Sequence, residues 1–274
     1  MLVPWSRVLV ALFSLGIRLG MGETAIASPE NIAPRPSPDS ARTLAPDTGE
    51  VGLISPLRYG AYEGIELSTR VFGALLLPQA SAKFHLFGGD PRAQRWSFAS
   101  RNTLSYPTWF FERIAKEGAG GLLPANTDVP LIVSLRSELM TGRGMGASHE
   151  LSLSIAAELA PRFTDGRLPL LDFPLLYPRF AASHSTATAD IGGAVFGSVW
   201  GPIRYHTDLR YYYLPLDTAD IAFDGGYAIE QSTTLTWDIN STWSTSVSYL
   251  WTHALYPIGT RTHSLPYADV IYRF

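Results

Sequence analysis

The clearest pattern in the chain is a period of two between apolar and polar residues near its C-terminal end. From Trp243 to Trp251, Trp, Thr, Val, Tyr and Trp alternate with Ser, Ser, Ser and Leu. Successive side chains of a β-strand point to opposite faces, so this run predicts a strand with one apolar face. Residues 227–239 alternate in the same way. Turn residues at 238–241 join the two runs and predict a β-hairpin.

The same alternation recurs along most of the chain. It predicts strands near residues 50–59, 64–76, 80–87, 95–105, 131–142, 150–162, 187–200, 203–213, 222–238, 243–256 and 265–274. Helical periodicity is nearly absent, and the exception is 107–116, where we expect a short amphipathic helix in a loop. The body is therefore predicted to be all-β and antiparallel.

The polar faces of these strands carry charges of both signs. The main members of this set are Glu66, Arg70, Arg136, Glu138, Arg204, Asp208, Arg210 and Glu230, with Glu158 and Asp238 beside them. In a soluble β-sandwich they would be solvated surface charges, whereas in a barrel they would compensate one another across the lumen. Such a set would either fill a small barrel or line a narrow solute path through it.

Aromatic residues favour the barrel over the sandwich. Trp243 and Trp251 stand at the two ends of the clearest alternating run. In membrane barrels, Trp and Tyr gather at the strand ends, where the lipid headgroups lie. The apolar face of a sandwich would instead be its dry core, and aromatic residues would not favour the margins of that core.

The start of the chain predicts export. Residues 1–7 carry a positive charge at Arg7, 8–17 form a short apolar run, and the small-x-small pattern at 25–27 marks a cleavage site, so we expect a signal peptide over 1–27. A membrane anchor is the alternative, but the run is too short to cross about 30 Å of hydrocarbon. Five prolines among Ser, Asp and Arg predict a disordered periplasmic segment at 28–50. The barrel then occupies 51–274.

The end of the chain carries the most specific motif. Phe274, Tyr272 and Val270 share one parity of the last predicted strand. A terminal Phe with Tyr two residues before it resembles the C-terminal assembly signal of Gram-negative outer-membrane β-barrel proteins. The alternating pattern covers roughly residues 50–274, but the specific motif is limited to the last ten residues. Ile271, which lies on the polar parity, departs from this pattern. The resemblance implies a transmembrane β-barrel in the outer membrane, in contact with outer-membrane lipid and the barrel assembly machinery.

The runs give an odd number of strands. A single-chain bacterial barrel with both termini in the periplasm needs an even number, so we expect ten strands, with twelve as the alternative. The long connections at 106–130 and 163–186 would then face outward. The apolar segment 168–180 is expected to fold over or into the barrel mouth, because it is too apolar to stand freely in water.

Composition excludes several classes of function. The chain has 274 residues, a net charge of -3 and Lys only at 83 and 116, so nucleic acid is not an expected partner. It has no Cys, which excludes disulfides, thiolate metal ligands and a Cys nucleophile. We expect no cofactor.

Candidate chemistry is sparse. None of the six His residues has a metal-binding spacing, and adjacent His–Ser pairs in a strand point to opposite faces. His253, His263 and Ser264 flank the last outer loop, which leaves an outer-membrane enzyme acting on lipid as a second hypothesis. The leading hypothesis is a channel or structural barrel of unknown solute, and a secreted soluble sandwich is the third. No catalytic, cofactor-binding or metal-binding residue is predicted.

Overall fold

The computed structural model describes most of the chain from residue 36 to the C-terminus. The described residues are 36–274 apart from 72, 76, 90–94, 116–127, 147, 167, 169–176, 216, 219–220, 223–225 and 257–258. The predicted signal peptide and the first part of the Pro-rich segment lie outside them.

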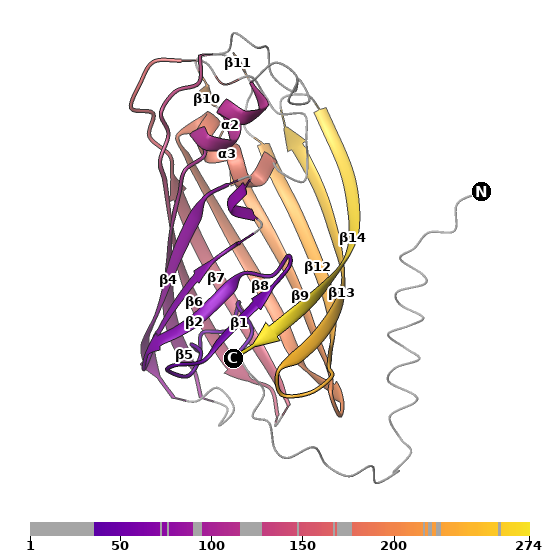
Figure 1. Cartoon of the computed structure of the whole chain (residues 1–274). Coiled ribbons are helices and arrows are strands. Elements are labelled where there is room, and N and C mark those ends of the chain that lie inside the picture. Colours follow the sequence, from indigo (N-terminus) through magenta and orange to yellow (C-terminus); the bar gives the residue numbers. More distant parts are fainter. Residues whose placement is uncertain are drawn as a thin grey trace, which may run out of the picture.

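Twelve antiparallel strands close into a single barrel (Figure 1). They are β1 (Gly49–Gly52), β2 (Leu57–Tyr62), β3 (Ile65–Thr69), β4 (Gln79–Gly88), β5 (Ser97–Ser105), β6 (Ser134–Gly144), β7 (His149–Leu159), β8 (Ala187–Trp200), β9 (Ile203–Leu214), β12 (Gly226–Asp238), β13 (Trp243–Tyr256) and β14 (Gly259–Arg273). Each strand pairs with the next one around the wall, and β1 pairs with β14 to close the sheet. The predicted all-β antiparallel barrel is confirmed, and the soluble sandwich is excluded.

The strand number is twelve, the alternative of the sequence prediction rather than the preferred ten. The predicted run at 50–59 contains two short strands, β1 and β2, joined by a turn at 53–56. Alternation alone does not separate two short strands from one long strand when the turn residues continue the polar and apolar pattern.

The remaining elements lie in connections between strands. These are η1 (Gly73–Leu75), α2 (Thr108–Ile114), α3 (Tyr177–Ser185) and a separate two-stranded sheet of β10 (Asp217–Thr218) and β11 (Ile221–Ala222). The helix predicted at 107–116 corresponds to α2. None of the helices in the described part of the chain is long and apolar enough to cross a membrane.

The two faces of the wall have opposite polarity. Leu139 and Val247 on the outer face are 59% and 64% exposed, whereas their neighbours Glu138 and Ser246 on the inner face are buried. Exposed Trp and Tyr residues stand near the strand ends of the outer face, as Trp200 and Trp237 do. An apolar outside around a polar inside is the arrangement of an outer-membrane-type β-barrel.

The two ends of the barrel differ in their connections. Tight turns such as residues 201–202 and 239–242 lie at the end that holds the C-terminus, and α2 and α3 lie at the opposite end (Figure 1). The long connections predicted at 106–130 and 163–186 therefore meet at the same end of the barrel. If the termini are periplasmic, that end faces the exterior.

The wall is uneven in strand length. Strands β12, β13 and β14 have 13 to 15 residues, whereas β1, β2 and β3 have only 4 to 6. As a result, β1 has only three register pairs with β14, which join Glu50, Val51 and Gly52 to Arg273, Tyr272 and Ile271, and the backbone of Gly49 bonds to that of Phe274 beside them.

Candidate functional site: the filled lumen

The segment at residues 36–48, which we call the plug, lies mostly inside the barrel, and its residues 45–47 are exposed. Ser40, Ala41 and Leu44 are 0%, 0% and 2% exposed. The Ser40 hydroxyl donates to Glu150 Oε1 on β7 at 2.6 Å, and the Leu44 backbone N–H donates to Glu66 Oε2 on β3 at 3.0 Å. Because these acceptors belong to well-separated strands, the plug crosses the lumen rather than following one strand.

This position differs from the prediction of a disordered segment at 28–50. The composition of the segment indicated correctly that it lacks the apolar area for a core of its own. The composition of the segment could not show that the wall orders it. Polar side chains of the wall form hydrogen bonds with the backbone of the plug. Ser152 donates to the carbonyl of Asp39 at 2.6 Å, and Lys83 Nζ lies 3.4 Å from the carbonyl of Ser40. Residues 28–35 lie outside the described part of the chain.

Arg58 on β2 links the plug to the wall. Its side chain is 1% exposed and donates to Glu66 Oε1 at 2.9 Å, to Glu50 Oε1 at 2.7 Å and to the carbonyl of Pro36 at 3.0 Å. Lys83 Nζ lies 3.3 Å from the same Glu66. A guanidinium buried among two carboxylates and a carbonyl has its donors satisfied, so the cost of burying its charge is offset.

A second ion-pair network crosses the middle of the lumen. Glu138 on β6 accepts from Arg101 at 2.6 Å and from Arg210 at 3.1 Å, and Arg210 also donates to Asp190 at 2.6 Å. Arg136 donates to Asp190 through both terminal nitrogens. Four strands therefore join across the lumen through alternating charges.

The predicted lumen residues fall into separate groups. Glu66 belongs to the Arg58 site, and Arg136, Glu138 and Arg210 belong to the central network. Three others lie apart: Arg204 pairs with Asp238 at 2.7 Å near the tight turns, Glu230 pairs with Arg179 of α3, and Asp208 faces His206. Arg70 lies just beyond β3, is exposed, and takes part in none of the ion pairs among the described residues.

Sequence reasoning missed several members of these groups, namely Asp39, Arg58, Lys83, Arg101, Arg179 and Asp190. The pairing of the strands identifies two of them, Lys83 and Arg101. Glu66 stands opposite Lys83, Lys83 opposite Arg101, and Arg101 opposite Glu138. Residues opposite each other on paired strands share a face of the sheet. If one residue of this row points into the lumen, all four therefore do. Asp39 gave no such signal, because the plug has no strand register.

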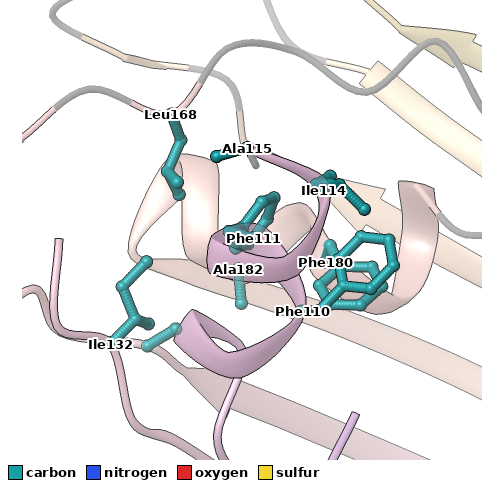
Figure 2. Close-up of a cluster of buried hydrophobic side chains, with 9 residues drawn as sticks. Phe110, Phe111, Ile114, Ala115, Ile132, Leu168, Phe180 and Ala182 are labelled. Carbon is teal, nitrogen blue, oxygen red and sulfur yellow. The ribbon is translucent and has the colours of Figure 1, made fainter. Parts of the chain in front are cut away.

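A hydrophobic cluster lies at the opposite end of the barrel, where α2 and α3 pack together (Figure 2). We call this cluster, formed by α2, α3 and adjacent loop residues, the cap. Phe110 of α2 stacks on Phe180 of α3 with ring centroids 4.6 Å apart, and Phe111 meets Phe180 edge to face at 5.4 Å. Leu168 and Ile132 are buried against these helices. Leu168 and Phe180 are the described ends of the apolar segment that was expected to fold over or into the mouth.

An ion pair fixes the cap to the wall. Arg179 of α3 donates to both carboxylate oxygens of Glu230 on β12, each at 2.8 Å. The charge of Glu230 raises the pKa of Arg179 above its ordinary value, although burial opposes this shift. Burial, with a smaller contribution from Arg162, lowers the pKa of His184 in the same helix to about 4. His184 is therefore neutral near pH 7.

The residues of the enzyme hypothesis do not form a triad in this geometry. His253 Nδ1 contacts Thr262 Oγ1 at 2.7 Å; His253 is half-buried and Thr262 is exposed. His263 and Ser264 are adjacent in β14, so their side chains point to opposite faces. Among the described residues, no carboxylate contacts His253 or His263.

The residues of the predicted assembly signal lie on the outer face of β14. Phe274, Tyr272 and Val270 are 51%, 39% and 45% exposed. Tyr272 lies 5.0 Å from Trp243 and 6.0 Å from Phe274, measured between ring centroids. The Gly49 N–H donates to the carbonyl of Phe274 at 2.8 Å, and the Phe274 N–H donates to that of Gly49 at 3.1 Å, so the terminal residue helps close the barrel.

Comparison with known proteins gives structural neighbours only. No family model and no curated protein matches the chain. OmpTΔL8, a loop L8 deletion mutant of OmpT, an outer membrane protein of Vibrio cholerae, has 7% identity and a TM-score of 0.43, covering 82% of this chain and 62% of that chain. OccK8 (OprE) of Pseudomonas aeruginosa has 8% identity and a TM-score of 0.34, covering 87% and 60%. The chain thus spans less than two thirds of either protein, and the fold assignment rests on its own closed sheet and two faces.

Proposed function

We propose that the protein is an outer-membrane channel for small polar solutes, closed at one end by the plug and at the other by the cap. The apolar outer face with aromatic strand ends supports a membrane location. The predicted signal peptide and the C-terminal motif support the outer membrane of a Gram-negative bacterium. We propose outer-membrane lipid and the barrel assembly machinery as its partners.

The observation that carries this proposal is the way in which the plug is held. It contacts the wall mainly through hydrogen bonds and ion pairs, and Ala41 and Leu44 are its buried apolar side chains. Water can replace polar contacts of this kind when the plug leaves, whereas an apolar core would lose its burial energy. The wall behind the plug is continuous sheet, so the vacated lumen would be lined by the polar inner face.

The ion pairs of Arg58 and of the central network cross the lumen and support a closed state. A cavity beside Asp39, lined also by Ser152, Asp208 and Arg210, has a volume of about 10 Å³. That volume is about the size needed to hold one water molecule. A channel of this design conducts only after the plug and the cap have moved.

Planar-bilayer recording of three variants tests the proposal. One variant lacks residues 36–46, the second carries Phe111→Ser and Phe180→Ser in the cap, and the third combines both changes. We expect little steady conductance from the unmodified protein and stepwise conductance from the combined variant. The control is Phe163→Ser, which changes a side chain that is 62% exposed and should stay closed.

Each variant is first checked for folding by its heat-dependent migration on gels. A combined variant that folds and inserts but does not conduct would contradict the channel and favour a purely structural barrel. Large conductance steps in the unmodified protein would contradict closure by the plug and the cap.

A further inference from the structure

A cluster of three metal-ligating side chains joins the plug to the wall. His206 and Asp208 on β9 are two residues apart, so both point into the lumen, and Asp39 of the plug meets them there. One ligand atom from each of the three side chains lies within 4.8 Å of the other two. An imidazole and two carboxylates are ligands that Zn²⁺ and similar divalent ions accept.

The geometry of His206 fits one ligand of a shared cation. Its Nε2 atom lies 3.2 Å from Asp39 Oδ2, and it is buried without a partner in hydrogen-bond geometry among the described residues. Two ligands of one tetrahedral Zn²⁺ stand about 3.4 Å apart, from metal–ligand distances of about 2.0 to 2.2 Å. The two atoms are thus placed as neighbouring ligands of a common ion.

The charges around the cluster leave two carboxylates, Asp39 and Asp208, without a close arginine partner among the described residues. The side chains that meet in this part of the lumen are the carboxylates Asp39, Glu138, Asp190 and Asp208 and the guanidinium groups Arg101, Arg136 and Arg210. Both Glu138 and Asp190 are bonded to two or more of these arginines. Asp39 has a longer contact of 3.4 Å with Arg101, and Asp208 enters no ion pair with an arginine in the described part of the chain.

The small cavity described above lies at the same place. Asp39 and Asp208 both line it, together with Ser152 and Arg210. Space next to the two carboxylates would admit a water molecule as a further ligand of an ion. The buried Nε2 atom of His206, which has no hydrogen-bond partner among the described residues, is an observation beyond the two carboxylates.

From these features we infer that a divalent cation of the Zn²⁺ class binds Asp39, His206 and Asp208 and ties the plug to the barrel wall. The ion needs neutral His206 and both ionised carboxylates. Since one ligand comes from the plug and two from the wall, binding would lower the free energy of the inserted plug relative to the released plug. This inference about the cation site does not depend on whether the barrel conducts solutes.

Co²⁺ is the probe for the first experiment, because its visible absorption reports the ligands around it. The folded full-length protein is treated with chelator in detergent and titrated with Co²⁺, and then with Zn²⁺. We expect one Co²⁺ per chain, displaced by Zn²⁺. His206→Gln, Asp208→Asn and Asp39→Asn should each weaken binding at least tenfold. His149→Gln is the matched control, because His149 is an exposed His on another strand.

The outcomes separate a linking site from other binding. No saturable Co²⁺ absorption, or equal weakening by His206→Gln and His149→Gln, overturns the site. Loss of binding in the two β9 variants with full binding in Asp39→Asn overturns the link to the plug.

Limited proteolysis of the plug gives a readout besides metal binding. Zn²⁺ should slow cleavage within residues 36–48 in the unmodified protein and not in His206→Gln, with heat-dependent migration showing that both are folded. Equal cleavage with and without Zn²⁺ in the unmodified protein also contradicts the link.

Discussion

At the scale of single residues, Arg58 is the side chain whose replacement is expected to lower the stability of the barrel most. Replacing it with Met would leave Glu66 buried with Lys83 as its remaining cationic partner and would release the carbonyl of Pro36. Removing one partner of a buried pair costs about 3 to 5 kcal/mol. We expect the urea midpoint of unfolding to fall accordingly. It is measured as loss of the compact gel form.

Arg261→Met provides the matched comparison for this variant. Arg261 lies on β14 and is exposed, so the same chemical change there should leave the midpoint nearly unchanged. Equal effects of the two substitutions would show that the buried pairs of Arg58 contribute no special stability.

His184 makes a pH dependence predictable. Burial lowers its pKa from the ordinary 6.5 to about 4 in the folded cap. Between these values the unfolded cap binds more protons than the folded cap, so the stability of the cap falls as the pH is lowered from 6.5 to 4. Protease cleavage in the loops around α3 should therefore rise over this range, and His184→Gln should remove that part of the rise. A variant that keeps the full pH dependence would assign it to another group.

At the scale of elements, the last strand gives a sharp prediction for assembly. Tyr272 and Phe274 are exposed on the outer face, while the backbone of Phe274 pairs with Gly49 to close the barrel. Replacing both side chains by Ser should leave secretion intact and lower the inserted, heat-modifiable fraction severalfold. The backbone pairing is kept in this variant, so a loss reports on recognition of the aromatic side chains.

The comparison for that variant is Tyr249→Ser with Trp251→Ser. These residues lie on the neighbouring strand β13 and have a similar apolar area, but they are far from the terminus. If both double variants insert equally poorly, the terminal residues carry no special signal and act only through lipid contact.

The elements also show what a sequence can predict. The wall was predictable because a strand between lipid and a polar lumen must alternate, and the alternation is visible residue by residue. The plug was not, because it is ordered by side chains more than a hundred residues away, as Ser40 is by Glu150. Local composition records only that such a segment cannot fold alone. The sequence preferred ten strands to the twelve of its alternative because β1 and β2 are too short to show separate periods.

The sequence predicted which charged residues face the lumen better than it predicted which of them form ion pairs. Parity placed Glu138 and Arg210 on the inner face, but it could not show that they meet across four strands of the wall. Pairing across a lumen depends on the number of strands and their tilt, which fix the residues that face each other.

At the scale of the whole molecule, the closed sheet predicts behaviour in fractionation. Every backbone group of the wall that faces lipid must be bonded within the sheet, so the barrel resists unfolding in detergent until heated. We expect the protein in the outer-membrane fraction, with a shift in gel migration on boiling. Recovery from the soluble periplasmic fraction, with no shift, would contradict a membrane barrel.

The plug and the closing strand follow one another directly in the chain. Leu44 is buried in the lumen, and Gly49, five residues later, begins the strand that meets β14 over three residue pairs, whereas β13 meets β14 over fourteen. A pull on the N-terminus is thus borne first by the contacts of the plug and then by the short joint between β1 and β14. The same covalent path means that a tightly seated plug shields that joint from mechanical load.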